Sequence, residues 1–243
     1  MKERLDKILV DSGLVKSRER AKALIMEGVV LVDGAAVTKA GALINSDSLV
    51  SLKKEDMPYV SRGGLKLKAA IEHFNIRLKD RTAMDVGSST GGFTDCMLQT
   101  GAKKVYCIDV GYGQIAWSLR NDPRVVLFER TNIRYLEKEK IPETIDIATI
   151  DVSFISLTKV IPKVMEFLNN GGEIIALVKP QFEVGREDVG KGGIVREEDK
   201  RLSALESVKG SLENTGLNII GTFQSPVPGQ KGNIEYFLYM RKG

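Results

Sequence analysis

The sequence predicts an α/β protein in which a small α+β unit precedes a mostly parallel sheet with an antiparallel last strand. Two observations lead to this prediction. Beyond residue 80, short runs rich in β-branched and apolar residues alternate with helical patterns, which is typical of parallel βαβ units. Before residue 53, two short helical patterns precede a hairpin signal instead. The 243 residues are 42% hydrophobic and 28% charged, an ordinary globular composition, and the chain is long enough to bury both cores.

Two helices are expected first. Apolar residues fall at helical spacing at 5–9 and 21–25, and Asp11-Ser12-Gly13 breaks the pattern between them. Ser17 is a favourable N-cap for the second helix, and Gly28 lies just past its end as a C-terminal stop. The pattern therefore predicts a helix pair joined by a tight turn.

A short sheet is expected after the helix pair. Residues 29–37 indicate a hairpin because Asp33-Gly34 divides two β-rich runs, and residues 48–52 indicate another strand. The polar stretch that follows ends in Pro58, which favours a domain boundary. We therefore expect an amino-terminal domain at 1–56, a linker at 57–62 and a larger domain at 63–243.

The larger domain contains five strand-like runs that alternate with helical patterns. They are Ala83–Val86, Val105–Val110, Val125–Phe128, Ile145–Val152 and Glu173–Val178. Two further β-rich runs, Asn218–Gln224 and Ile234–Met240, are joined by a loop rich in proline and glycine. They predict an antiparallel edge that closes the sheet.

Composition excludes several classes of protein. One histidine, His73, and two cysteines, Cys96 and Cys107, are too few for a zinc site, so we expect no metal. The charged start lacks the core of a signal peptide, and no run approaches the roughly 18 apolar residues that a spanning helix needs. We therefore expect a cytoplasmic protein without a membrane partner. The net charge of +4 is too modest to identify a nucleic-acid partner by itself.

Basic residues gather on the two amino-terminal helices, where they suit phosphate contact or simply form a solvated face. The segment from Lys2 to about Leu52, with RLDKILVDSGLVKSRERAKALIMEG, resembles the S4 RNA-binding domain. Recognition of shape and phosphates fits a folded RNA. The resemblance implies RNA contacts by Arg4, Lys7, Lys16, Ser17, Arg18 and Lys22.

A glycine-rich turn, GSSTGG, follows the first strand of the larger domain. It is neither the dinucleotide-binding GxGxxG nor a P-loop, which would contain a lysine. Asp85 on the strand would repel a pyrophosphate, which argues against NAD. Asp109 ends the next strand 24 residues further on, where a carboxylate can accept from ribose hydroxyls. The alternative is a turn that only packs strand against helix.

Together DVGSSTGGFT and CIDVG resemble the first two motifs of class I S-adenosylmethionine-dependent methyltransferases, which have a Rossmann-like fold. In that family the loop surrounds the methionine part, and Asp109 would hold the ribose. Asn132 lies where the adenine is usually contacted. The resemblance implies that S-adenosyl-L-methionine is bound by Asp85, Gly87, Ser88, Gly91, Gly92, Phe93, Asp109 and Asn132.

Four charged residues lie in or beside apolar runs, where an unpaired charge is costly. Asp151 and Lys179 follow predicted parallel strands, at the edge where open α/β sheets bind ligands. Glu235 interrupts the last β-rich run, and Lys66 follows a Gly-Gly pair. Buried salt bridges with a purely structural role are the alternative. Lys68 is an equally basic neighbour of Lys66, which we prefer because it follows SRGG at the spacing of the family described next.

The set Lys66, Asp151, Lys179 and Glu235 resembles the catalytic tetrad of FtsJ-like ribose 2′-O-methyltransferases. Together with the S4-like unit, the whole chain resembles the TlyA (haemolysin A-like) family of ribosomal RNA methyltransferases. The resemblance implies cytidine 2′-O-methylation of ribosomal RNA in ribosomal subunits. It leaves open which subunit is the substrate and which oligomeric state the protein has.

A ribose hydroxyl must lose its proton when it is methylated, whereas the leaving thioether needs no acid. A lysine with a reference pKa of ~10.4 is a poor base unless desolvation or a second cation lowers that value. We expect Lys179 to accept or polarise the proton, Asp151 to position Lys179, and Lys66 to lower its pKa. We expect Lys66 with Glu235 to fix the nucleotide.

Three other functions are less well supported. Methylation of a base amine would need an Asn-Pro-Pro-Tyr type of motif after the fourth strand, where this sequence has DVSF. Methylation of cytosine C5 would need a nucleophilic cysteine, and neither Cys96 nor Cys107 lies in a loop suited to that role. A non-catalytic ribosome-assembly factor would not need the four charges. A haemolysin would need membrane-inserting segments, and we expect pure protein not to lyse liposomes.

The glycine-rich segment 181–193 is expected to form a lid or a plain loop, and Phe182 to stack on an extruded nucleotide.

Overall fold

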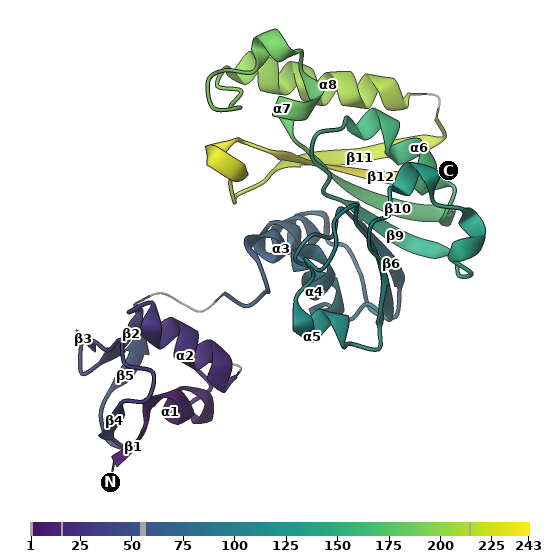
Figure 1. Ribbon diagram of the computed structural model, residues 1–243. Coiled ribbons are helices and arrows are strands. Elements are labelled where there is room, and N and C mark those ends of the chain that lie inside the picture. The colour runs from purple at the N-terminus through teal and green to yellow at the C-terminus, as the bar shows by residue number, and fades with distance from the viewer. Residues whose placement is uncertain (1, 16, 54–56, 214) are drawn as a thin grey trace. The chain divides into compact units, whose positions relative to one another are not determined.

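The structure is a computed structural model that describes residues 2–15, 17–53, 57–213 and 215–243. The chain divides into two units, Met1–Pro58 and Tyr59–Gly243. Each unit has its own buried hydrophobic residues. Figure 1 shows the helices and strands of both units.

The amino-terminal unit packs two helices against short strands. The helices are α1 (Leu5–Asp11) and α2 (Arg18–Met26), and the strands are β1 (Lys2–Arg4), β2 (Val30–Val32), β3 (Ala35–Ala36), β4 (Leu43–Asn45) and β5 (Val50–Leu52). Ser17 caps α2 because its side chain accepts a hydrogen bond from the backbone of Arg20. Gly28 has a φ of +70° just beyond α2. The helix pair, its capping residues and the hairpin are therefore confirmed, whereas β1 and β4, which pair with each other, were not predicted.

The second unit is built on a seven-stranded sheet with the order β11-β12-β10-β9-β6-β7-β8. Its strands are β6 (Thr82–Val86), β7 (Lys104–Ile108), β8 (Val125–Phe128), β9 (Ile145–Ile150), β10 (Leu168–Val178), β11 (Leu217–Gln224) and β12 (Tyr236–Lys242). The pairs among β6 to β10 are parallel, as predicted. β12 runs antiparallel to both of its neighbours and lies between β10 and β11, so β11 forms the edge of the sheet.

Helices cover both faces of this sheet (Figure 1). The α-helices are α3 (Arg62–Phe74), α4 (Gly92–Gln99), α5 (Trp117–Arg120), α6 (Ile161–Met165), α7 (Pro180–Glu183) and α8 (Glu198–Leu212). Short 3-10 turns are η1 (Ile133–Tyr135), η2 (Lys138–Lys140), η3 (Leu157–Lys159), η4 (Arg186–Asp188) and η5 (Gln230–Gly232).

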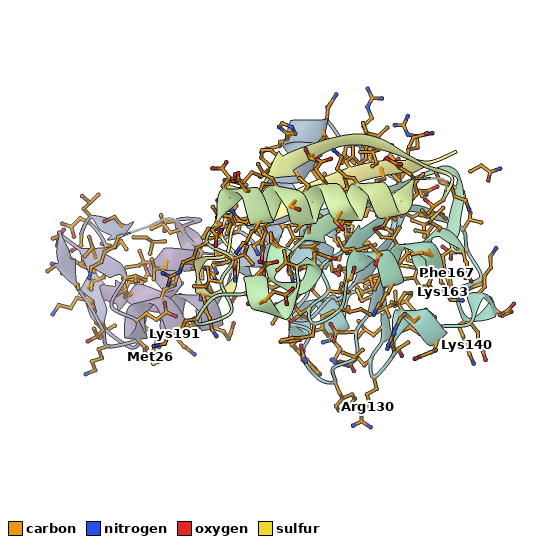
Figure 2. The ribbon with its side chains drawn as sticks, turned by 90° about the horizontal axis from the view of Figure 1, so that it is seen from above. Met26, Arg130, Lys140, Lys163, Phe167 and Lys191 are labelled. Atoms are coloured by element: carbon orange, nitrogen blue, oxygen red, sulfur yellow. The ribbon has the colours of Figure 1, made fainter. Side chains whose placement is uncertain are left out.

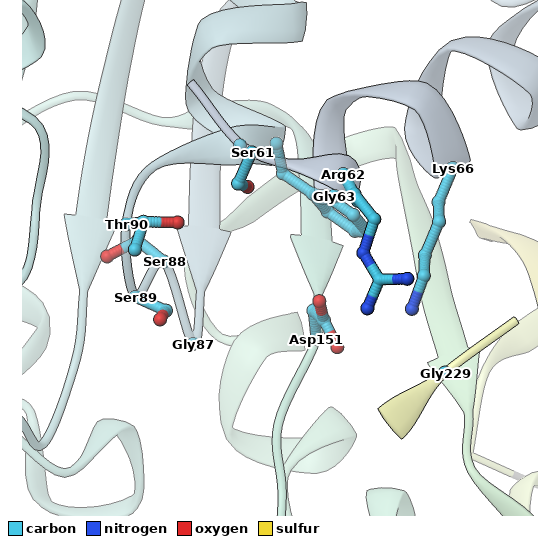
Figure 3. Close-up of a pocket in the computed structure, with 12 residues that line it drawn as sticks. Ser61, Arg62, Gly63, Lys66, Gly87, Ser88, Ser89, Thr90, Asp151 and Gly229 are labelled. Carbon is cyan, nitrogen blue, oxygen red and sulfur yellow. The ribbon is translucent and has the colours of Figure 1, made fainter. Parts of the chain in front are cut away.

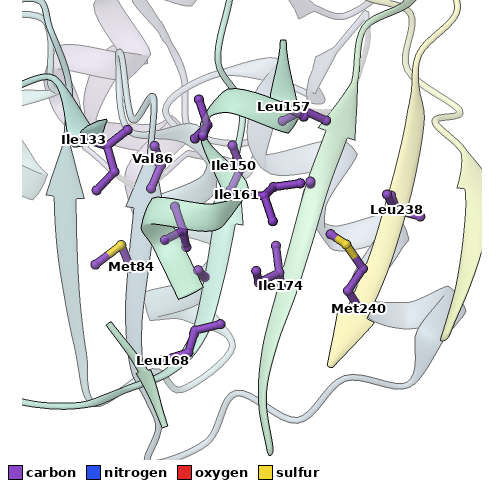
Figure 4. Packing of buried hydrophobic residues seen from close by; sticks show 14 of the residues in the cluster. Met84, Val86, Ile133, Ile150, Leu157, Ile161, Leu168, Ile174, Leu238 and Met240 are labelled. Carbon is purple, nitrogen blue, oxygen red and sulfur yellow. The ribbon is translucent and has the colours of Figure 1, made fainter. Parts of the chain in front are cut away.

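The two faces bury separate clusters because successive strand residues point to opposite sides. Met84 and Ile150 pack with α6 and α8 on one face, together with Ile161 (Figure 4). Ala83 packs with α3 and α4 on the other face. At the border of the first cluster, the ammonium of Lys163 lies 5.7 Å from the ring centroid of Phe167, both labelled in Figure 2.

Candidate functional site

The candidate site lies where β6, β9 and β10 end, and the glycine-rich loop after β6 shapes it. Gly87 has a φ of +84°, and a Cβ there would lie 2.5 Å from the carbonyl oxygen of Asp151. Gly91, the N-cap of α4, has a φ of +91°, and its Cβ would lie 2.3 Å from Leu119. Only glycine fits these positions, so the loop can run close to the end of β9.

Two cavities open beside this loop, and both are lined by Gly87, Ser89 and Asp151. The smaller has a volume of about 220 Å³ and the larger about 800 Å³. Among the predicted cofactor residues, those at the smaller cavity are Gly87, Ser88, Gly92 and Phe93, and those at the larger are Gly87, Asp109 and Asn132. Gly91 lines neither cavity and acts through the shape of the loop.

Asp85 differs from the predicted cofactor residues that line the cavities, because it is fully buried and lines neither cavity. Its neighbours across the sheet are Thr149 and Cys107. Thr94 donates to Oδ2 at 2.6 Å, and Thr149 donates to Oδ1 at 3.1 Å. Burial raises the pKa of Asp85 to about 7. In this structure the carboxyl group therefore joins β6 to α4 and β9 through its two hydrogen bonds.

Asp109 lies at the larger cavity, as expected for a ribose acceptor. Its Oδ2 accepts from the backbone N–H of Ser89 at 2.7 Å, and its Oδ1 accepts from Gly111 at 2.7 Å. These two bonds fix the carboxylate, and each oxygen keeps a lone pair for a further donor. Asn132 lines the same cavity, and its side-chain oxygen accepts from the backbone of Arg134 at 3.1 Å.

The four charged residues form two ion pairs. Lys179 Nζ lies 2.6 Å from Asp151 Oδ1, and Lys66 Nζ lies 2.7 Å from Glu235 Oε2. The lysine side chains are each 12% exposed, and Glu235 is 2% exposed. Asp151 and Lys66 line the smaller cavity, whereas their partners Lys179 and Glu235 line neither cavity and reach the site through these ion pairs. The fold thus brings together residues separated by up to 169 positions in the sequence.

Of the two candidate lysines on α3, Lys66 is the one at the cavity. Lys68 pairs with Glu72 on the exposed side of the same helix, at 3.0 Å. The loop before β12 packs closely against Glu235, the partner of Lys66. A Cβ at Gly229 would lie 1.9 Å from Glu235 Oε1. A side chain at this position would therefore displace the carboxylate from its present place beside Lys66.

The start of α3 supplies site residues that the sequence analysis did not assign. Ser61, Arg62 and Gly63 line the smaller cavity, and the side chains of Arg62 and Lys66 extend together toward Asp151 (Figure 3). The sequence signal for this contact is the glycine at position 92, because a Cβ there would lie 2.2 Å from Ser61 Oγ and 3.0 Å from the backbone nitrogen of Gly64.

Two phenylalanines stand at the larger cavity. The ring centroids of Phe154 and Phe182 are 5.0 Å apart, and both residues line the cavity. Phe154 is 90% exposed and has a φ of +62°, a conformation that is costly for a bulky residue. An exposed, strained aromatic residue next to Asp151 is suited to stacking on a ligand.

In the amino-terminal unit, Arg4 and Arg18 both contact a residue that was not predicted. Asp6 is 0% exposed and accepts from Arg4 Nε at 2.9 Å and from Arg18 Nη2 at 3.0 Å. The hydrogen bond from Arg4 is the main reason that the pKa of Asp6 falls to about 2. The two arginines therefore share a structural ion pair, and about half of each side chain stays exposed.

The other predicted RNA-binding residues differ in their partners. Lys7 is exposed and pairs with Glu3 of β1 and with Asp11 at the end of α1. Lys22 is half-buried on α2, and the hydroxyl of Ser17 is used in capping that helix. Lys16 lies outside the described residues.

The residues considered for other chemistry lie away from both cavities. Cys96 and Cys107 are buried, and burial raises the pKa of the Cys96 thiol to about 11. His73 stacks on Phe223 with centroids 4.1 Å apart. Within the described residues, no group of three or more metal-ligating side chains occurs, and no helix is long and apolar enough to cross a membrane.

The fold and the glycine-rich loop define an adenosylmethionine-dependent methyltransferase of the Rossmann-like type. The family models agree: an FtsJ-like methyltransferase model matches residues 59–242, and an S4 domain model matches residues 3–50. The chain belongs to the FtsJ-like methyltransferase family and carries an S4 domain at its amino terminus.

Named relatives are similar over nearly the whole chain. The 16S/23S rRNA (cytidine-2′-O)-methyltransferase TlyA of Mycobacterium tuberculosis is 45% identical over 239 residues, which is 98% of this chain and 89% of the relative. Hemolysin A of Brachyspira hyodysenteriae is 41% identical and covers 97% of this chain and 98% of its own length. The resemblance to the TlyA and haemolysin A group is therefore confirmed.

Solved structures agree with this assignment. A hemolysin-named protein from Streptococcus thermophilus is 44% identical, has a TM-score of 0.76, and covers 99% of this chain and 88% of its own. The N-methyltransferase NodS of Bradyrhizobium japonicum, in complex with S-adenosyl-L-homocysteine, is 15% identical with a TM-score of 0.52. It covers 74% of this chain and 85% of its own, and it confirms the fold alone.

Proposed function

We propose that this protein methylates the ribose 2′-hydroxyl of a cytidine in ribosomal RNA, with S-adenosylmethionine as the methyl donor. The observation that carries the proposal is the pair of lysine–carboxylate contacts, Lys179–Asp151 and Lys66–Glu235, beside the glycine-rich loop. The printed name of the Mycobacterium tuberculosis relative supports the choice of ribosomal RNA and cytidine.

The residues around the two cavities fit S-adenosylmethionine. The glycine at position 87 leaves room that a Cβ would fill, and Asp109 offers a fixed carboxylate to ribose hydroxyls. Asn132 and the larger cavity suit an adenine, and Ser88 and Phe93 border the smaller cavity for the methionine part. When bound there, the cofactor would supply an electrophilic methyl group.

The chain's own residues then handle the proton of the 2′-hydroxyl. Lys179 is proposed to accept or polarise this proton, and Asp151 holds the amine by charge at 2.6 Å. Lys66, fixed by Glu235, lines the smaller cavity together with Asp151 and is proposed to hold the nucleotide. Phe154 and Phe182 are proposed to stack on the extruded base, because a ribose inside folded RNA is otherwise poorly accessible.

The S4 domain is proposed to dock the RNA. Its described basic side chains include Lys7 and Lys22, and Arg4 and Arg18 keep about half of their surface exposed beside Asp6. Such contacts to phosphates give affinity and orientation, whereas the larger domain provides the chemistry.

The test is transfer of a labelled methyl from S-adenosylmethionine to isolated 30S and 50S subunits, with the product mapped by nuclease digestion. We expect label on a cytidine 2′-oxygen, and its loss in Lys179→Ala and Lys66→Ala. Lys68→Ala is the matched control, because Lys68 lies on the same helix as Lys66 but pairs outside the cavity.

Calorimetry with S-adenosylmethionine separates binding from chemistry. Asp109→Ala is expected to lose most of the affinity, whereas Asp199→Ala, an exposed carboxylate on α8, keeps it. If the wild-type protein binds the cofactor and RNA but transfers no methyl to either subunit or to their assembly intermediates, a non-catalytic RNA-binding role replaces the proposal.

A further inference from the structure

We infer that Ser153 is a positioning residue for Lys179. It fixes the direction of the amine so that the nitrogen lone pair is left for the ribose hydroxyl. This inference rests on the proposed function, in which Lys179 takes the proton, and it adds a fifth residue to the four charged ones.

Lys179 contacts two oxygens of different kinds. Its Nζ lies 3.0 Å from the hydroxyl oxygen of Ser153 with hydrogen-bond geometry. The shorter contact to Asp151, at 2.6 Å, is an ion pair whose angles do not meet that geometry, since Oδ1 is buried without a hydrogen-bond partner. Asp151 therefore supplies charge without direction, and the directional contact comes from Ser153.

Ser153 is well placed for this role. It follows β9 two residues after Asp151 and lines the larger cavity, whereas Lys179 begins the segment after the adjacent strand β10. The hydrogen bond therefore joins the ends of two neighbouring parallel strands. Because a hydroxyl carries no charge, it holds the amine without competing with Asp151 for the charge of the ammonium.

The effect of the hydrogen bond from Lys179 to Ser153 follows from the number of donors and lone pairs on the amine nitrogen. A neutral lysine amine has two N–H donors and one lone pair. When Ser153 accepts from one N–H, the rotation about the Cε–Nζ bond is set. The charge of Asp151 attracts the second N–H to its side, so the lone pair is the position that remains for the incoming proton. Without Ser153, the amine can rotate about its Cε–Nζ bond, and an N–H can occupy that position instead.

The experiment compares Ser153→Ala, Ser153→Thr and the exposed control Ser203→Ala in the full-length protein. Methyl transfer to ribosomal subunits gives kcat and the KM for RNA, and calorimetry gives the Kd for S-adenosylmethionine. We expect Ser153→Ala to lower kcat about tenfold while KM and Kd change by less than about twofold, because a general base contributes about 10²- to 10⁴-fold and only its orientation is lost. Ser153→Thr keeps the hydroxyl and is expected to restore kcat to within about threefold.

A second readout needs no turnover. Competitive labelling with trace acetic anhydride, read by mass spectrometry, reports how readily each lysine amine reacts, with Lys68 as internal reference. We expect Lys179 to react about threefold faster in Ser153→Ala than in the wild type, because one hydrogen bond no longer restrains it, and Ser153→Thr to match the wild type.

Three outcomes overturn the inference. In the first, Ser153→Thr is as impaired as Ser153→Ala. In the second, Ser153→Ala raises KM with kcat unchanged, which makes Ser153 an RNA contact. In the third, Lys179 labelling is the same in all variants. If Lys179→Ala retains turnover, the proposed function itself loses its base; if Lys179→Ala is inactive and Ser153→Ala is normal, only the role of Ser153 fails.

Discussion

Asp85 is the residue whose environment in the structure differs most from the environment that its sequence motif predicts. A carboxylate before a glycine-rich turn suggests a ligand contact, yet its oxygens accept from Thr94 and Thr149 inside the sheet. Thr94 Oγ1 also lies 3.0 Å from Cys107 Sγ, so a short polar chain crosses the apolar core. Burial raises the pKa of Asp85 to about 7, which means that the folded protein favours the protonated form.

This shift predicts a pH-dependent stability. With a folded pKa of about 7 against an ordinary 3.8, the folded state binds a proton that the unfolded state has lost between these values. The contribution of Asp85 to the free energy of unfolding is therefore present below about pH 4 and declines as pH rises to about 7. Asp85→Asn cannot ionise, so its stability relative to the wild type is expected to rise from pH 4 to pH 7 and then level off. Urea unfolding across this range measures it.

The control for that experiment is Asp80→Asn, since Asp80 is exposed in the turn before β6, outside any helix terminus, and asparagine tolerates its φ of +63°. This variant should track the wild type at every pH. Parallel curves for Asp85→Asn and the wild type from pH 4 to pH 8 would contradict the elevated pKa.

The role of a residue could be predicted from the sequence where a short segment determines it. It could not be predicted where the role depends on partners far along the chain. Asp109, Asp151 and Lys179 follow strands, so their approach to one edge could be expected from the sheet alone. Asp6 reads as one more surface charge, because only the fold shows that two arginines enclose it. Ser153 is uncharged, so nothing in the sequence distinguishes it from other serines. Only the pairing of β9 with β10 shows that it contacts Lys179.

At the scale of elements, the strands were predicted better than their ends. The apolar runs continue to Val110 and Val152, but β7 ends at Ile108 and β9 at Ile150, because the chain leaves the sheet to form the site. β10 begins earlier than its apolar run, at Leu168, through a register shift before Glu173. Short strands such as β1 and β4 carry too few residues for a period of two to appear.

The glycine-rich loop gives a sharp prediction at position 87. Gly87→Ala adds a Cβ 2.5 Å from a backbone oxygen at a φ of +84°, so the loop or the end of β9 must shift. We expect a loss of stability of about 2 kcal/mol or more and at least about tenfold weaker S-adenosylmethionine binding. Thermal unfolding and calorimetry measure the two effects.

Gly171→Ala is the matched control for this change. Gly171 has a similar φ of +75°, but a Cβ there would meet nothing within 4 Å. It should therefore lose only the smaller energy of the backbone strain and bind the cofactor normally. Equal cofactor affinities for the two variants would show that the close approach at Gly87 does not shape the site.

A second prediction concerns the contact between the two loops that carry Asp151 and Lys179. Glu183, at the end of α7, accepts from the backbone N–H of Leu157 at 2.9 Å. Burial raises the pKa of Glu183, so its ionised form is disfavoured in the folded protein. Glu183→Gln keeps an acceptor without the charge and should gain stability relative to the wild type as pH rises through the folded pKa. Glu183→Ala leaves the N–H without its acceptor and should lose about 1–2 kcal/mol.

Chemical denaturation of the three proteins at pH 5 and pH 8 makes this comparison. The Gln variant should gain on the wild type between the two values, whereas the Ala variant should be the least stable at both. An Ala variant as stable as the Gln variant would mean that the hydrogen bond to Leu157 does not hold the two loops together.

For the whole molecule, the chain divides into two units, and the proposed function assigns RNA affinity to the first and methyl transfer to the second. If the amino-terminal unit supplies phosphate contacts, removing its cations should weaken RNA binding without changing the methyl-transfer site. Arg4 and Arg18 are poor choices for this test, because each also pairs with buried Asp6 and its loss would disturb the fold of that unit. Lys7 and Lys22 are better choices, because neither is among the described partners of Asp6 and the printed pairs of Lys7, with Glu3 and Asp11, lie at the surface.

We therefore expect Lys7→Ala combined with Lys22→Ala to lower RNA affinity about 10- to 100-fold at low salt. The slope of log affinity against log salt should fall by about 2, one unit for each lost phosphate contact. Lys138→Ala combined with Lys140→Ala, two exposed cations of the second unit, removes the same charge and should leave the slope nearly unchanged. Filter binding to 30S and 50S subunits across a salt series gives the slopes, and calorimetry should show the same Kd for S-adenosylmethionine in all proteins. An equal loss of slope in both double variants would mean that RNA responds to net charge alone, and the S4 domain would no longer be the docking unit.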